Sequence, residues 1–337
     1  MIEPTTAVNG IKAGAPVIAS MMQGLSSLAK KGKDSLTDKI VAEFQIGFSE
    51  ILERSFERCQ KVRTLTSGDN PSLLSDIYVN LKLSNDNDSY EDIEIVENLE
   101  SYKRIVVTGL AGAGKSMFMK YLTIGRFENN KDKFPLFVEL RYLNSMSSND
   151  ILNYCFYSTA SANNKLSFQN FIKLTKAGVF IFIFDGFDEL EPHIKDDIEG
   201  QILKLSRDYP KALIVVSSRP ENRFSSWTNF RVFHVCKMNL KDSTSVIEKI
   251  NHDPGIKKRF KREMPSLWVT HSSFLSIPLL ATIMLMTFGK FSEISPKFSL
   301  FYKLAFQTLF REHDASKEQF KRTIQSGLGR VDKRLQP

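Results

Sequence analysis

The spacing of apolar and polar positions changes along the chain and divides the sequence into three regions. Before residue 92, apolar residues recur at helical spacing, most clearly over residues 37–65. Between residues 92 and 237, short β-branched and aromatic runs alternate with helical patterns. After residue 238 only helical patterns remain. The alternation predicts an α/β domain with a mainly parallel sheet flanked by helices, followed by a helical region.

Strands and helices are expected to alternate within the middle region. The strands are predicted at 105–108, 136–140, 179–185, 213–217 and 232–235. The helices are predicted at 149–157, 168–176 and 194–208, and those of the last region at 241–250, 256–264, 279–288 and 297–310. In an open sheet of this kind, ligands bind outside the carboxyl ends of the strands. Residues that directly follow the strands are therefore the first candidates for a site.

The region before residue 92 is expected to contain two parts. Residues 1–36 predict a helical segment that either contacts a membrane or a second copy, or packs on its own protein. Glu3 and Pro16 make it a poor signal peptide. Residues 37–91 predict a long helix and a linker, with a short strand at 76–83 and a polar loop at 84–89. The sheet domain is therefore expected to begin near residue 92.

The formal net charge of +8 is unevenly distributed. Residues 237–337 contain eighteen lysines and arginines and nine aspartates and glutamates, and the densest basic run is 257–262. Such a region could attract nucleic acid, a membrane or an acidic partner domain, or form a solvated helix face. Cys59, Cys155 and Cys236 form no C-x-x-C pair, which favours a reducing, cytoplasmic location.

Residues 268–289 contain no Asp, Glu, Lys or Arg, which raises the question of a membrane span. Pro278 interrupts this stretch, and its continuous apolar part covers only residues 279–286. A bilayer requires about 20 apolar residues in a helix. We therefore predict a buried helix and no transmembrane segment.

The most specific motif follows the strand predicted at 105–108. It matches G-x-x-x-x-G-K-[ST] and consists of Gly109, Leu110, Ala111, Gly112, Ala113, Gly114, Lys115 and Ser116. Its glycines allow backbone N–H groups to surround a phosphate, and the following helix adds a positive N-terminal dipole. Lys115 would reach the β- and γ-phosphates of a nucleotide, and the Ser116 hydroxyl would bind Mg²⁺.

Two further groups follow predicted strands. Asp185 ends the strand at 179–185 and would carry a carboxylate to the Mg²⁺. Asp188 and Glu189 come directly afterwards, and either could orient the attacking water. Arg219 follows the strand at 213–217, where a guanidinium could contact a γ-phosphate and report its presence.

Together, the glycine loop, the run Asp185–Glu189 and the run Ser217–Pro220 resemble the NACHT branch of the STAND signal-transduction NTPases. The small residue after Asp185 and the following Asp-Glu pair are the distinguishing details. Residues 134–141 also match the second strand of the family, and residues 275–279 match the proline segment of its helical domain. The resemblance covers about residues 62–311.

The resemblance implies an Mg²⁺-dependent switch that is closed with ADP and is open and oligomeric with ATP. It assigns phosphate binding to residues 109–116, Mg²⁺ to Ser116 and Asp185, sensing to Arg219 and base contact to Pro278. Asp188 and Glu189 would serve hydrolysis. Among the members of this branch, the chain resembles bacterial NACHT proteins of antiphage defence, and this resemblance implies a phage-derived trigger and self-assembly. The N-terminal segment 1–36 is then a candidate effector.

Under this resemblance, the domains are a NACHT domain at 92–237, a helical domain at 238–292 and the start of a winged-helix domain at 293–337. The last domain is expected to be truncated, and His313 is a poor candidate for the histidine that locks ADP in such proteins. A GTPase fits less well, because Gly186 directly follows Asp185 and residues 130–133 lack the guanine-reading spacing. The main alternative is a nucleic-acid-stimulated P-loop ATPase that uses the basic patch.

Overall fold

The computed structural model describes residues 54–67, 70–86, 88–129, 133–146, 150–158 and 167–291. The chain divides into two compact units. The sheet unit contains the described residues up to 62 and from 72 to 237, and the helical unit contains 63–71 and the residues from 238 onward. The predictions for residues 1–36, for the helix at 297–310 and for a winged-helix start at 293 lie outside the described residues.

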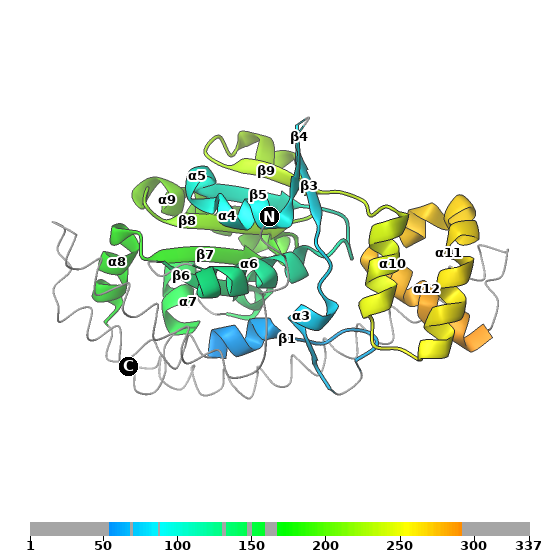
Figure 1. Cartoon of the computed structure of the whole chain (residues 1–337). Coiled ribbons are helices and arrows are strands. Elements are labelled where there is room, and N and C mark those ends of the chain that lie inside the picture. Colours follow the sequence, from blue (N-terminus) through cyan, green and yellow to red (C-terminus); the bar gives the residue numbers. More distant parts are fainter. Residues whose placement is uncertain are drawn as a thin grey trace. The chain divides into compact units, whose positions relative to one another are not determined.

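A seven-stranded sheet forms the centre of the sheet unit, with the order β4-β3-β9-β5-β8-β7-β6 (Figure 1). Strands β5 to β9 run parallel to one another, whereas β3 pairs antiparallel with both β4 and β9. The strands are β3 (Lys82–Asn85), β4 (Asp88–Glu91), β5 (Arg104–Thr108), β6 (Phe134–Glu139), β7 (Phe180–Asp185), β8 (Leu213–Ser218) and β9 (Arg231–Val235). This arrangement confirms the predicted fold class and the five predicted strands.

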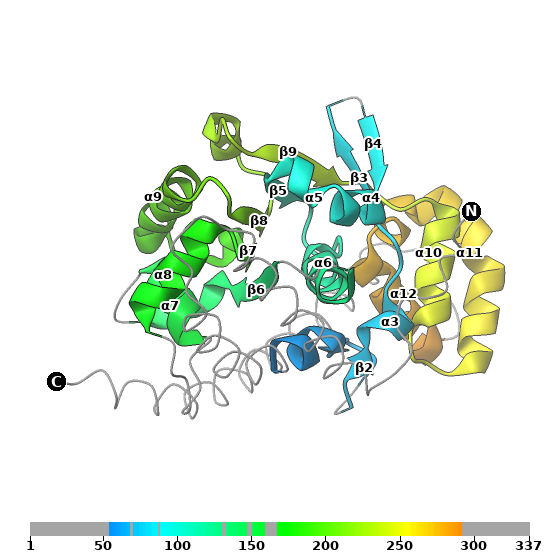
Figure 2. The same cartoon turned by 60° about the vertical axis from the view of Figure 1, so that its left-hand side comes forward.

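The central strands are buried on both faces because helices cover the sheet on both sides. Every residue of β7 and β8 is buried. In Figure 2, α6 (Lys115–Asn129) lies on one side of the sheet and α9 (Pro192–Asp208) on the other. Strand β8 lies between β5 and β7, so the carboxyl ends of these three strands are neighbours at one rim of the sheet.

The remaining elements of the sheet unit are short. They are β1 (Lys61–Val62), β2 (Ser72–Leu73), α3 (Leu74–Ile77), α4 (Asp92–Glu97), α5 (Leu99–Tyr102), η1 (Leu140–Ser145), α7 (Ile151–Ser158), α8 (Phe168–Ala177), η2 (Phe187–Glu189) and η3 (Asn222–Ser226). The helix that precedes β1 covers residues 54–60 within the described part of the chain. Cys59, Cys155 and Cys236 form no disulfide bond.

The structure differs from the sequence predictions before residue 92. The predicted loop at 84–89 belongs to a β3–β4 hairpin, so the sheet begins before residue 92. The predicted strand at 76–83 is wrong over its first part, which lies in α3 and an extended segment. Polar residues dominate the hairpin because it forms the edge of the sheet, and among the hairpin residues that the structure describes only Leu83 is fully buried. The helix predicted to reach residue 65 ends at residue 60, where β1 begins.

The helical unit contains α10 (Leu240–Lys249), α11 (Pro254–Leu275) and α12 (Pro278–Phe291), which pack around one apolar core. The helix predicted at 256–264 is longer than expected, because α11 continues through Pro265 with a kink at His271. The charge-free stretch 268–289 spans the end of α11 and most of α12, and Val269 within it is exposed. Among the helices that the structure describes, none has the length and apolar character needed to cross a membrane.

Candidate functional site

The glycine loop connects β5 to α6, in the strand–loop–helix setting that the sequence predicts. Gly112 and Gly114 adopt φ angles of 75° and 99°, and a residue with a side chain would be strained in this region. Lys115 begins α6, and its Nζ donates hydrogen bonds to the carbonyl oxygens of Gly109 at 2.7 Å and Leu110 at 3.1 Å. The ammonium group therefore lies over the loop, where it could exchange these carbonyls for phosphate oxygens.

The electrostatic surroundings of Lys115 fit an anion site. Burial lowers the pKa of the Lys115 ammonium, and the nearby carboxylates of Asp188 and Asp185 oppose this shift. A bound phosphate would add negative charge at the same position and stabilise the charged ammonium further. The loop can therefore bind a phosphate group through both its backbone and this side chain.

Asp185 lies at the carboxyl end of β7 and is 7% exposed. The Ser217 hydroxyl donates to Asp185 Oδ1 at 2.5 Å and accepts a hydrogen bond from the Gly186 N–H at 2.8 Å. Burial raises the pKa of the Asp185 carboxyl, while hydrogen bonds with Ser217 and Ser116 favour its charged form. Ser116 and Asp185, the two predicted Mg²⁺ ligands, are thus neighbours. A hydroxyl and one carboxylate, completed by phosphate and water oxygens, suit the octahedral shell of Mg²⁺.

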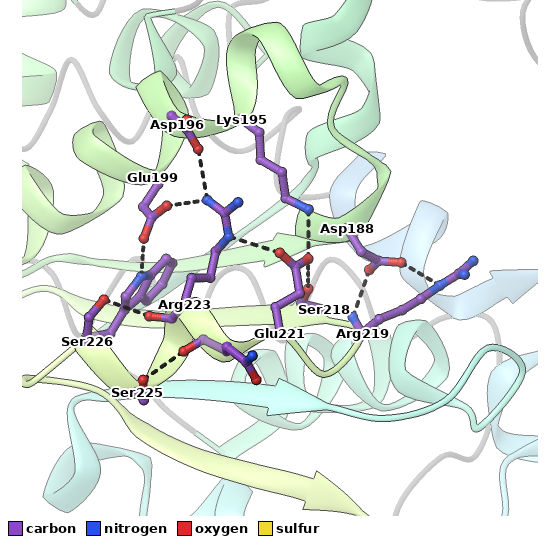
Figure 3. A network of polar contacts seen from close by, with 12 residues as sticks. Asp188, Lys195, Asp196, Glu199, Ser218, Arg219, Glu221, Arg223, Ser225 and Ser226 are labelled. Carbon is purple, nitrogen blue, oxygen red and sulfur yellow. Dashed lines mark hydrogen bonds and ion pairs between the residues drawn. The ribbon is translucent and has the colours of Figure 1, made fainter.

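Asp188 and Glu189 both lie in η2 but have different surroundings. Asp188 Oδ1 accepts the Arg219 N–H at 3.1 Å, and Asp188 Oδ2 lies 2.9 Å from Arg219 Nε (Figure 3). The Asp188 side chain is only 13% exposed. Glu189 is 39% exposed, and its Oε2 lies 3.8 Å from Arg141 Nη1. Asp188 is therefore held by Arg219, and Glu189 is the more accessible of the two to a water molecule.

Phe187, between Asp185 and Asp188, anchors this turn in the core. Its ring is fully buried and contacts Phe224 and Trp227 edge to face, with centroid distances of 5.8 and 5.7 Å. The Lys195 ammonium and the Arg223 guanidinium lie 5.2 and 5.7 Å from the same ring centroid. These contacts fix the backbone from which Asp188 and Glu189 project.

An ion-pair network joins α9 to the loop that carries Arg219 (Figure 3). Glu221 Oε1 accepts a hydrogen bond from Lys195 at 2.7 Å, and Oε2 accepts one from Arg223 Nε at 2.9 Å. Arg223 also pairs with Glu199 and Asp196 on α9. Because Glu221 lies two residues after Arg219, the network restrains the loop on the side away from Asp188.

Sequence reasoning missed several residues that shape the site. The role of Ser217 could have been inferred from its place at the end of a strand next to β7. Asn144 carried no such signal: its Nδ2 donates to the Glu189 carbonyl and its Oδ1 accepts the Glu191 N–H, both at 2.9 Å. Asn144 lies in η1, because the strand predicted at 136–140 ends at Glu139. It holds η2 from the side opposite Ser217.

Nearly all predicted site residues lie at the rim formed by β5, β7 and β8. The exception is Pro278, which begins α12 in the helical unit. Its contact with a base stays a prediction. The roles of residues 109–116, Asp185, Asp188, Glu189 and Arg219 in binding and hydrolysis also remain predictions, although the fold places these residues in one neighbourhood.

A phosphate-binding loop between a parallel strand and a helix, with an acid at the end of a nearby strand, defines a P-loop nucleoside triphosphatase. Residues 103–254 match the family model of the NACHT domain, so this part of the chain is a NACHT domain, a nucleoside triphosphatase domain of the STAND type. A search of curated proteins found no match to the chain.

We predict that Asp185→Asn raises the thermal unfolding midpoint of the nucleotide-free protein at neutral pH. Folding raises the pKa of the Asp185 carboxyl, so the folded state loses stability as pH rises from the usual carboxyl range through this raised pKa. The gain should shrink toward about pH 3, below the ordinary Asp pKa of about 3.9, where the carboxyl is largely protonated in both states. Calorimetry across this range checks it, with the exposed Asp208→Asn as control. An advantage of wild type that grows with pH would contradict the prediction.

Proposed function

We propose that the chain is an ATP-binding and ATP-hydrolysing switch that oligomerises on activation and acts in bacterial antiphage defence. One observation supports the switch most directly. Arg219, the candidate γ-phosphate sensor, pairs with Asp188 at the same rim as the glycine loop and Asp185. A direct ion pair therefore holds the candidate sensor to the turn that also carries Glu189, the candidate for orienting the attacking water.

In the proposed reaction, the glycine loop and Lys115 hold the phosphates of ATP. Ser116 and Asp185 hold Mg²⁺, which supplies positive charge to the phosphate oxygens when bound. Glu189 orients the attacking water and accepts its proton, because its carboxylate is the more accessible of the two candidates. Asp188 holds Arg219 in place, and Ser217 keeps the Asp185 carboxylate aligned.

The switch itself follows from competition for Arg219. A γ-phosphate would attract the guanidinium away from Asp188, and only ATP carries this group. A ligand shifts a conformational equilibrium only by its differential affinity for the two states. The Arg219–Asp188 pair gives ATP and ADP such a difference.

Assembly would bring the N-terminal segments of several copies together. Clustering raises their effective concentration, so a weak effector interaction at 1–36 becomes strong. In this proposal the chain works in the cytoplasm, the trigger is a phage product and the N-terminal helix is the part that contacts a membrane. This step rests on the motif resemblance described in the sequence analysis.

A nucleic-acid-stimulated ATPase is the second candidate, and the contacts of the basic run disfavour it. Lys257 Nζ donates to the carbonyls of Glu248 and Ile250 at the end of α10, at 2.6 and 2.9 Å. Lys261 pairs with the Glu248 side chain, and the Arg259 guanidinium lies 5.9 Å from the Phe288 ring centroid. Three of the five cations in the run 257–262 therefore contact other parts of the helical unit. Stimulation of ATP turnover by DNA or RNA would favour this candidate over the switch.

We predict that Lys115→Ala abolishes ATP binding and leaves the fold intact, because the ammonium provides the point charge on the phosphates. ATP at 100 times its dissociation constant should stabilise wild type by about 2.7 kcal/mol. Thermal unfolding with and without ATP and Mg²⁺ measures this, and Lys176→Ala on the exposed side of α8 is the matched control. An equal ATP-induced shift in Lys115→Ala would refute the assignment.

We predict that Arg219→Ala still binds ATP but no longer changes its assembly state with the nucleotide. Light scattering coupled to size-exclusion chromatography, run with ATP and with ADP, measures the change. Wild type should form larger particles with ATP than with ADP, whereas Arg219→Ala should elute alike in both. If the variant assembles with ATP as wild type does, Arg219 is not the sensor.

For the biological role, we predict that at least one phage of a broad panel forms fewer plaques on bacteria that express the chain than on control cells. Protection should disappear in Lys115→Ala, because assembly depends on bound ATP. Plaque counts on wild type, Lys115→Ala and empty-vector cells provide the measurement. Equal counts in all three strains with every phage would count against defence.

A further inference from the structure

A second pair of charged contacts reaches the site from the other side of Asp185. Glu139 ends β6 and is the register partner of Asp185 on β7, so its carboxylate lies at the same rim. The Glu139 side chain is only 12% exposed and binds two guanidinium groups. Arg58 contacts Glu139 Oε2, and Arg141 Nη2 lies 2.6 Å from Glu139 Oε1. One carboxylate oxygen is therefore assigned to each arginine.

The two arginines come from distant parts of the chain. Arg58 lies in the helix at 54–60, and Arg141 lies in η1 directly after β6. Both guanidinium groups approach the Tyr142 ring, at 5.5 Å for Arg58 and 5.2 Å for Arg141. A shared carboxylate and a shared aromatic ring hold the two cations close together in spite of their like charge.

The geometry of Arg141 depends on this sharing. Its Nη2 binds Glu139, while its Nη1 lies 3.8 Å from Glu189 Oε2. A guanidinium frequently binds both oxygens of one carboxylate in a two-point pair. Because Arg58 occupies Oε2 of Glu139, Arg141 takes only Oε1 and directs its other terminal nitrogen toward Glu189. Removal of Arg58 would open Oε2 and allow Arg141 to turn away from Glu189.

We propose that Arg141 is a positioning residue for Glu189 and that Arg58 enforces this position, so that the helix at 54–60 controls the rate of hydrolysis. The inference rests on the proposed function, in which Glu189 orients the attacking water. It adds a physical connection between the chain that precedes the sheet and the site. Displacement of this helix would slow hydrolysis and prolong the ATP-bound state.

The test compares ATP turnover and ATP affinity in Arg58→Met, Arg141→Met and the double variant. Methionine keeps the apolar stem beside Tyr142 and removes the charge and the hydrogen-bond donors. Each single variant should lower kcat by about tenfold, which is a part of the roughly 10²- to 10⁴-fold rate gain that a positioned base contributes. The ATP dissociation constant should change less than about twofold. The double variant should be no slower than Arg141→Met, because both changes break the same contact. Lys61→Met, an exposed cation three residues after Arg58, should match wild type.

Conservative variants separate positioning from folding. Arg58→Lys should keep most of the turnover, because one ammonium suffices to occupy Glu139 Oε2. Arg141→Lys should stay slow, because a single ammonium cannot reproduce the two directed contacts of the guanidinium. If Arg58→Met does not fold, Arg58→Ala and this pair of lysine variants provide the same comparison.

The outcomes distinguish the inference from the proposed function. If wild type shows no ATP turnover, or if Glu189→Gln turns over ATP like wild type, the proposed reaction fails. If Glu189→Gln is slow but Arg58→Met and Arg141→Met turn over ATP like wild type, the positioning inference alone is overturned. Multiplicative losses in the double variant, or weakened ATP binding that accounts for the loss in rate, would also overturn it.

Discussion

The site depends on a carboxylate that is held out of water at the end of a buried strand. Burying a group that must ionise is costly unless hydrogen bonds or opposite charge compensate. At Asp185 the compensation comes from Ser217 and Ser116, with Lys120 and Arg141 as the nearby positive charges. A metal ion would add the charge that these groups do not fully supply. The proposed affinity for Mg²⁺ and the predicted lower stability of the empty protein would thus be two effects of one buried carboxylate.

The strand order explains how the remaining groups reach this carboxylate. Since β8 lies between β5 and β7, Ser217 on β8 can bind Asp185 on one side, while the residues after β8 face the turn after β7. Phe187 then fixes that turn in the core, and Glu221 and Arg223 fix the loop after β8. The geometry of the candidate site is therefore a consequence of packing and strand order more than of any single contact.

The sequence predicted the motifs and their strands because local signals determine both. A glycine loop between a β-branched run and a helical pattern, and an acid after six apolar residues, can be recognised without knowing which strands pair. The contacts of Glu139 could not be predicted, because they require the register that sets Glu139 opposite Asp185. The β3–β4 hairpin was missed for a different reason: an edge strand buries little, so its residues look like a loop. The base-contacting role of Pro278 remains a prediction from resemblance alone.

The polar character of that hairpin also limits how the protein can associate with copies of itself. Strand β4 is the outermost strand on its side of the sheet, and Asp88, Ser89 and Glu91 are exposed on it. An unpaired strand edge can recruit a strand from another molecule, and charged side chains oppose such recruitment. The β4 edge is consequently protected against continuous sheet extension between molecules, a route that leads to irreversible aggregation. A reversible assembly must then use side-chain surfaces instead of backbone pairing at this edge.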